Sequence, residues 1–350
     1  MTKSSTGNFF EDFRLGQEIV HAVPRTITTG DVSLYSALYG MRFPVQSSDA
    51  FAQSVGLARA PIDNLLLFHV IFGKTVPDVS LNAVANLGYA ECRFLRPAYP
   101  GDSFTARSTV IGLRENANGK TGIVYVRSTG FSQDGEAVLS FVRWVMVNKR
   151  DTSAPPPESV VPETAAEVKG DELVIPDGLD FTGYDRALAG SPYLFDDYAV
   201  GETIDHIDGM TVEEAEHQIA TRLYQNTAKG HFDGLAQKSS RFGRRIIYGG
   251  HVISLARSLT FNGLANAAFV VAINGGRHVS PAAGGDTIYC WSEVVANHAF
   301  ANRADVGALR IRTIATKDLP CAAFPTPGGE VDASILLDLD YWVLAPRRAG

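Results

Sequence analysis

Two side chains in the stretch "RLYQNTAKGHFD" (222–233), Asn226 and His231, stand five residues apart and offer acid–base chemistry. An imidazole with a pKa of ~6.5 can take up and release a proton near neutral pH. An amide does not titrate, so Asn226 can only hold a water molecule through its side-chain carbonyl or fix the imidazole. A lone histidine is more often structural. The position of His231 in this stretch, and the residue at the equivalent position of a repeated stretch, favour a catalytic role over that alternative.

Two glycines, Gly249 and Gly250, open an apolar stretch that predicts a helix over 249–264. The first amide groups of a helix have no intrahelical acceptor and lie at the positive end of its dipole. Glycine also lets a ligand carbonyl approach the backbone closely. The four residues together therefore provide a base and hydrogen-bond donors for a developing negative charge.

The sequence contains an internal duplication. Four pairs of stretches match with nearly constant spacing: 9–19 with 193–204, Leu38–Tyr39 with Leu223–Tyr224, 93–103 with 277–287, and 143–150 with 341–348. Fixed-period self-similarity is the signature of a duplicated unit. Met41 and Gln46 of the first copy stand opposite Asn226 and His231 of the second, so the first copy lacks the titrating group. The duplication places the chemistry in the C-terminal half.

The repeat divides the chain into three parts. Residues 8–150 form a degenerate N-terminal domain, and residues 173–350 form the catalytic domain. Between them, 151–172 is rich in proline, serine and acid, which is typical of an extended linker. Each copy has a short helix, a loop, a longer apolar helix and then β-rich runs with β-branched or alternating residues. This order predicts an α+β fold in which an antiparallel sheet wraps around a central helix.

These residues resemble the MaoC-like hydratases, which have the hot-dog fold. Asn226, His231, the pair Gly249–Gly250 and the turn over 281–286 match the family's hydratase motif, although the family usually has aspartate at the position of Asn226. The resemblance covers 8–150 and 190–348 and implies a double hot-dog. It implies an acyl-CoA hydratase or dehydratase acting on a branched C5 dicarboxylic enoyl thioester. CoA is then part of the substrate and no other cofactor is expected.

Two other functions remain open on the residues alone. A hot-dog acyl-CoA thioesterase would use the same fold, although hydrolysis would favour a carboxylate or an activated water where Asn226 stands. A catalytically inactive acyl-CoA-binding module is the second alternative, because the first copy has already lost its titrating group. In two-copy relatives the degenerate half helps to house the acyl group. Asp63 and Asn64 are expected opposite Gly249 and Gly250.

A basic stretch just before the central helix is a candidate for the CoA phosphates. It contains Lys238, Arg241, Arg244 and Arg245. A solvated loop is the alternative for such a cluster.

The free carboxylate of the substrate favours a planar cation, since arginine makes bidentate contacts with carboxylates. Arg277 is the candidate for this role, with a structural salt bridge as the alternative. Arg42 or Asn86 of the first copy could also reach the pocket. Three other histidines are interpreted as structural: His217 on the polar side of its helix, His251 packed along the central helix, and His278 entering a strand.

Composition excludes several classes of protein. A net charge of −7 argues against a nucleic-acid binder. No apolar run is long enough to span a bilayer, and the first residues lack the layout of a signal peptide. The three cysteines, Cys92, Cys290 and Cys321, are too scattered for a disulfide framework or a metal site. We therefore expect a cytoplasmic protein with no bound metal, no nucleic-acid partner and no membrane partner. A homo-oligomer is also expected.

Overall fold

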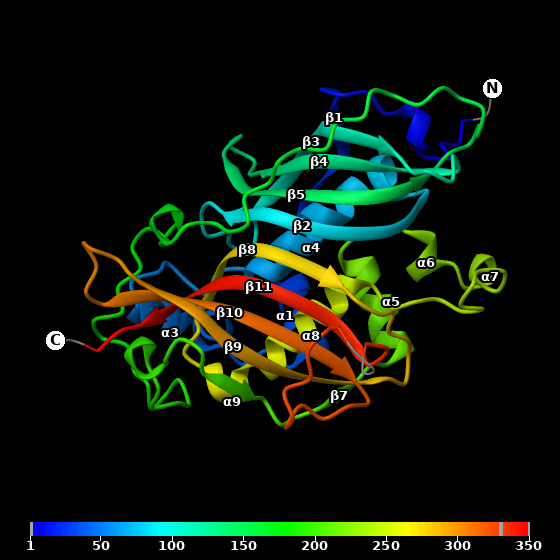
Figure 1. Ribbon diagram of the computed structural model, residues 1–350. Helices are drawn as coiled ribbons and strands as arrows, with labels where there is room; N and C mark the ends of the chain where they lie inside the picture. Colours follow the sequence, from blue (N-terminus) through cyan, green and yellow to red (C-terminus); the bar gives the residue numbers. More distant parts are fainter. Residues whose placement is uncertain (1–2, 329–331, 349–350) are drawn as a thin grey trace.

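A computed structural model describes residues 3–328 and 332–348 and shows two similar halves side by side (Figure 1). The first half contains β1 (Glu18–Thr26), α1 (Thr29–Tyr39), α2 (Pro44–Ser47), α3 (Asp49–Ser54), α4 (Asn64–Thr75), β2 (Ala83–Phe94), β3 (Ser103–Glu115), β4 (Thr121–Phe131) and β5 (Ala137–Asn148). The second half contains β6 (Thr203–Asp205), β7 (Met210–Thr211), α5 (Glu214–Leu223), α6 (Lys229–Phe232), α7 (Gly234–Gln237), α8 (Gly249–Leu259), α9 (Phe261–Leu264), β8 (Phe269–His278), β9 (Thr287–Ala299), β10 (Val306–Lys317) and β11 (Ile335–Pro346).

The strands form one continuous antiparallel sheet. Its order is β1-β3-β4-β5-β2-β8-β11-β10-β9-β6, with β7 paired to β9. The order within the second half repeats that of the first, and β2 pairs with β8 to join the halves. The predicted α+β double hot-dog is confirmed, with four long strands following the central helix in each copy.

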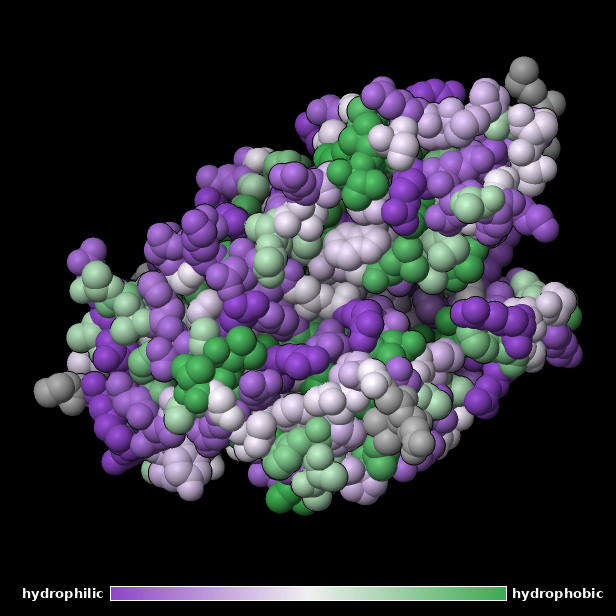
Figure 2. Space-filling model, in the orientation of Figure 1, coloured by the Kyte–Doolittle hydropathy of each residue, from purple (hydrophilic) through white to green (hydrophobic). Residues whose placement is uncertain are grey.

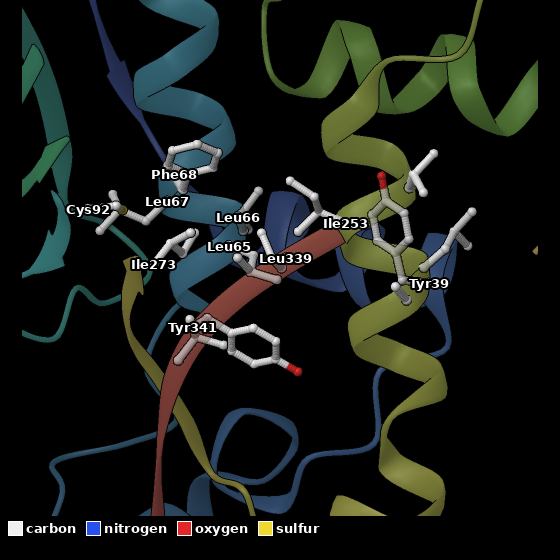
Figure 3. Close-up of a cluster of buried hydrophobic side chains, with 14 of the residues drawn as sticks. Tyr39, Leu65, Leu66, Leu67, Phe68, Cys92, Ile253, Ile273, Leu339 and Tyr341 are labelled. Atoms are coloured by element: carbon white, nitrogen blue, oxygen red, sulfur yellow. The ribbon is translucent and has the colours of Figure 1, made fainter. Parts of the chain in front are cut away.

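The central helices α4 and α8 form the core between the halves. Eleven residues of α4 are buried, from Leu65 to Thr75, because the helix is apolar on every side. Ten residues of α8, from Gly250 to Leu259, are also buried. Figure 3 shows side chains of both helices meeting residues of β2, β8 and β11, including Cys92, Ile273 and Tyr341. All three cysteines are buried free thiols.

The segment between the halves is irregular but is not detached from the protein. Val168 is buried, and its carbonyl accepts a 2.8 Å hydrogen bond from the Trp342 indole. Val160 forms a bridge with Leu113 on β3. Although its composition predicts an extended linker, the segment lies against the sheet because a few apolar residues find partners there. No helix in the described part of the chain is long and apolar enough to cross a membrane.

Candidate active site

A cavity of about 540 Å³ lies between the two halves. The first half contributes residues from the C-terminal end of α4, from β2 and from β5, and the second half contributes the segment from Asn226 to Gly249 and the end of β8. In Figure 2 the surface is hollowed between the strands of the first half and the segment that carries α6 and α7. A pocket between two packed units is a common location for a ligand site.

His231 lines this cavity with one defined tautomer. Its Nδ1 lies 2.9 Å from the carbonyl oxygen of Ile246, and a carbonyl can only accept, so Nδ1 carries the proton. Nε2 therefore presents a lone pair, and no side chain or amide in the described residues bonds to it. Burial lowers the pKa of His231, opposed by the hydrogen bond to Ile246. The ring is consequently a neutral base at physiological pH.

Asn226 is buried in the wall of the same cavity. Its Oδ1 accepts a 3.1 Å hydrogen bond from the Ala228 amide, which identifies the oxygen and fixes the side chain in a tight turn. Nδ2 has no bonded partner among the described residues and remains available as a donor. One hypothesis from the sequence was that Asn226 fixes the imidazole, and the structure shows no such hydrogen bond between the described side chains. The carbonyl of Ile246 holds that ring.

Gly249 is the first residue of α8 and lines the cavity, whereas Gly250 is buried behind it. No acceptor in the described part of the chain bonds to either amide. A Cβ on Gly249 would lie 2.3 Å from the His278 ring, and one on Gly250 would lie 2.4 Å from Tyr248. Both positions therefore require glycine for close packing. Gly249 is the better placed of the two amides for a ligand oxygen in the cavity.

The positions predicted from the sequence for His217 and His278 are both wrong. His217 is fully buried, and its Nε2 accepts the Tyr248 amide at 2.9 Å, which satisfies the residue just before the helix start. It does not lie on the polar side of α5. His278 ends β8 rather than entering a strand, lines the cavity, and its Nε2 lies 3.1 Å from the Tyr89 hydroxyl. Their long-range partners leave no signal in the local sequence. His251 is buried, as expected for a packing residue.

The predicted phosphate-binding cations separate into different environments. Arg241 lines the cavity, together with Lys229, which the sequence analysis did not select. Lys238 and Arg244 are exposed and do not line it. Arg245 forms an ion pair with Glu214 at the start of α5.

Arg277, predicted for the substrate carboxylate, is also exposed and does not line the cavity, because its side chain leaves the sheet on the solvent side. Arg42 likewise stays outside and stacks over the Phe261 ring at 4.5 Å. Asn86 does reach the cavity wall.

The corresponding residues of the first copy make different contacts. Gln46, opposite His231, donates a 2.8 Å hydrogen bond to the Ala268 carbonyl. Because α4 begins at Asn64 and α8 at Gly249, Asn64 stands opposite Gly249, one position from the predicted pairing. The side chain of Asn64 donates a hydrogen bond to the Val270 carbonyl at 2.7 Å.

Comparisons with known proteins decide the family. The model of the mesaconyl-CoA hydratase family matches residues 2–323. The chain belongs to this family. A β-methylmalyl-CoA dehydratase of Chloroflexus aurantiacus is 61% identical over 348 residues, covering 99% of each chain. A mesaconyl-CoA hydratase of Cereibacter sphaeroides is 58% identical over 349 residues, covering 99% of this chain and 100% of that one.

Solved structures agree with the hot-dog architecture of the mesaconyl-CoA hydratase family. A MaoC domain protein dehydratase from Chloroflexus aurantiacus superposes with a TM-score of 0.97 at 60% identity, covering 100% of both chains. A double hot-dog protein of Mycobacterium tuberculosis has a TM-score of 0.76 at 25% identity, with 97% and 98% of the two chains covered. The duplicated fold is therefore shared with a protein that is only 25% identical in sequence.

Proposed function

We propose that this protein catalyses the reversible hydration of mesaconyl-CoA to β-methylmalyl-CoA. Water adds to the β carbon, which bears the free carboxylate, and a proton adds to the α carbon, which bears the methyl group. Negative charge develops on the thioester oxygen between these events. The proposal is supported by family membership and by one observation: a neutral imidazole whose bare Nε2 shares a cavity with the free amide of Gly249.

His231 performs the proton transfer in this scheme. Nε2 takes a proton from water as the oxygen attacks the β carbon, and the imidazolium can return that proton to the α carbon. The Ile246 carbonyl keeps Nδ1 protonated and the ring in position throughout. Asn226 cannot titrate, so a single base serves both half-steps, while Nδ2 of Asn226 holds the water or the substrate.

Gly249 stabilises the enolate oxygen in the same scheme. Its amide stands at the start of α8, where the helix dipole favours negative charge. Removing one donor of this kind typically costs about 10²–10³ in rate. Gly250 allows the tight packing behind it and is a supporting residue.

The CoA moiety lies toward the open end of the cavity, where Arg241 and Lys229 can meet its phosphates. Lys238, Arg244 and Arg245 are not part of this set. The cytoplasmic location and the homo-oligomer expected from the sequence stay predictions.

An assay with purified protein and mesaconyl-CoA tests the function. We expect loss of enoyl-thioester absorbance without release of free thiol. Thiol release would establish a thioesterase instead. No change in either signal, with mesaconyl-CoA bound, would leave an inactive binding module.

A further inference from the structure

Arg143 is an unpaired cation inside the cavity. It stands on β5 of the first half, is fully buried, and lines the same cavity as His231. Its Nη2 donates to Thr75 Oγ1 at 2.7 Å, and two longer contacts of 3.4 Å reach Ser80 Oγ. Nε has no partner. No carboxylate of the described residues forms an ion pair with this guanidinium.

A buried charge without a counterion is costly, so such groups are normally paired or neutralised. Burial lowers the pKa of Arg143 to about 10, which still leaves it protonated at neutral pH. The side chain stacks over the Phe72 ring with 4.2 Å between Cζ and the centroid, so its position is defined by packing. The guanidinium is therefore positioned to bind an anion that comes from a ligand.

A neighbouring polar side chain is also unsatisfied. Asn86 lines the cavity, and both its side-chain oxygen and nitrogen are buried without a partner. Asn86 stands on β2, the strand paired with β5, and Tyr89 of β2 lies directly across from Arg143. The Tyr89 hydroxyl lies 3.1 Å from His278 Nε2. Groups from β5 and β2 thus converge on one part of the cavity wall.

The charge of the whole cavity fits an anionic ligand. Among the described residues that line it, three carry a positive charge, Arg143, Lys229 and Arg241, and none carries a carboxylate. Arg241 is exposed, which suits the large and hydrated phosphates of CoA. Arg143 is buried, which suits a small anion on the acyl group.

Two aromatic rings, Phe72 and Tyr248, lie between Arg143 and His231. Phe72, under the guanidinium, has its ring centroid 5.7 Å from that of Tyr248. Tyr248 in turn lies 5.5 Å from the His231 ring. A carboxylate held by Arg143 would therefore bring the carbon that bears it toward the base.

We propose that Arg143, assisted by Asn86 and Tyr89, binds the free carboxylate of the acyl group and selects dicarboxylic enoyl thioesters. The inference rests on the proposed function and names its specificity site. It gives the degenerate half a direct role, since Arg143 belongs to the first copy and His231 to the second. The repeat places Tyr341 opposite Arg143, so the second copy has no arginine at the corresponding position.

Catalytic selectivity gives the first test. Arg143→Gln is compared with wild type on mesaconyl-CoA and on the analogue that has a methyl group in place of the carboxylate, 2-methylbut-2-enoyl-CoA. Losing one partner of a desolvated ion pair should lower kcat/KM for mesaconyl-CoA on the order of 10²–10³-fold. Turnover of the methyl analogue should change less than about threefold. Equal losses on both substrates would overturn the assignment. Arg114→Gln, at an exposed site on β3, is the matched control.

Binding of inert ligands separates this inference from the proposed reaction. The dissociation constant of methylsuccinyl-CoA should rise in Arg143→Gln, while that of 2-methylbutyryl-CoA should not change. Equal affinity of wild type for both saturated ligands would overturn the carboxylate site even if hydration is observed. The reverse result, strong preference for methylsuccinyl-CoA with no hydration, would retain the site and reject the reaction.

Thermal stability distinguishes a ligand-binding arginine from a structural one. Arg143→Met keeps the packing over Phe72 and removes the unpaired buried charge, so the ligand-free protein should unfold at an equal or higher Tm. A fall in Tm of several degrees would make the Thr75 contact structural and count against the proposal. Should either variant fail to fold, wild type alone still decides: the methyl ester of mesaconyl-CoA, which is neutral at the same position, must be a poor substrate.

Discussion

The hydroxyl groups of Tyr39 and Tyr224 lie 2.7 Å apart, although the two residues hold the same position in the two copies. His69 and Ser254, related in the same way, also form a direct hydrogen bond, of 2.9 Å. Equivalent residues meet only where a pseudo-twofold axis passes. The halves therefore associate as the two subunits of a homodimer would, and the wall of the cavity combines residues of both.

The first prediction concerns His231. His231→Gln gives the catalytic half the residue type that the first copy has in Gln46. Glutamine can still donate a hydrogen bond to a backbone carbonyl, but it cannot titrate. We expect kcat to fall by about 10²–10⁴, the usual contribution of a positioned acid–base group. Circular dichroism should be unchanged. Turnover within tenfold of wild type would remove His231 from the mechanism.

The second prediction uses the pH profile. His231 must be neutral to act, and its pKa is lowered by burial, so kcat/KM should fall only as the pH drops below the ordinary histidine range. Asn226→Asp adds a negative charge to the wall of the cavity that His231 also lines, which favours the imidazolium. The acid limb should then move to higher pH. Asn118→Asp, in an exposed turn, is the control, and an identical profile for Asn226→Asp would place that residue away from the reacting water.

The third prediction concerns Gly249. In Gly249→Ala the new Cβ would lie 2.3 Å from the His278 ring, which must then move within the cavity. We expect a destabilisation of about 1–3 kcal/mol and a loss of kcat. Gly183→Ala, where nothing lies within 4 Å of the added atom, should be close to neutral. Full activity in Gly249→Ala would show that the added methyl group neither displaces His278 nor blocks the approach of a ligand oxygen to this amide.

The fourth prediction concerns stability at acidic pH. Burial lowers the pKa of His217 to about 2, of His69 and His251 to about 3, and of His206 and His278 to about 4. Since the unfolded chain binds these protons near pH 6.5, stability is fully present above that pH and is lost as the pH falls toward the folded values. Each group can contribute up to about 1.4 kcal/mol per pH unit.

Urea unfolding at pH 7.5, 6.0 and 5.0 checks this expectation. The free energy of unfolding should decrease below pH 6.5 by several kcal/mol in total, and the urea midpoint with it, because the pKa values of all five histidines are lowered in the folded protein. A midpoint that is constant down to pH 5 would contradict the neutral, buried state of the cluster around Tyr248.

The local sequence predicted the elements well because their signals are local. The β-rich runs of the second half became β8 to β11. The helix predicted over 249–264 became α8, which already ends at Leu259, and the separate short α9. The linker composition did not reveal that Val168 is buried, since that depends on the distant Trp342. For the same reason His217 was misjudged: its acceptor role depends on the Tyr248 amide, 31 residues away.

By itself the sequence determined the duplication, the double hot-dog and the half that retains an imidazole, because repeats, periodicity and residue types are properties of the chain. Only the tertiary structure decided which cations face the ligand. Arg277 and Arg241 look alike in sequence, yet one faces solvent and the other a cavity. Arg143 lies in the site because β2 pairs with β8. This pairing brings strands of the first copy close to the start of α8 in the second copy. Contacts set by long-range strand pairing leave no trace in local spacing.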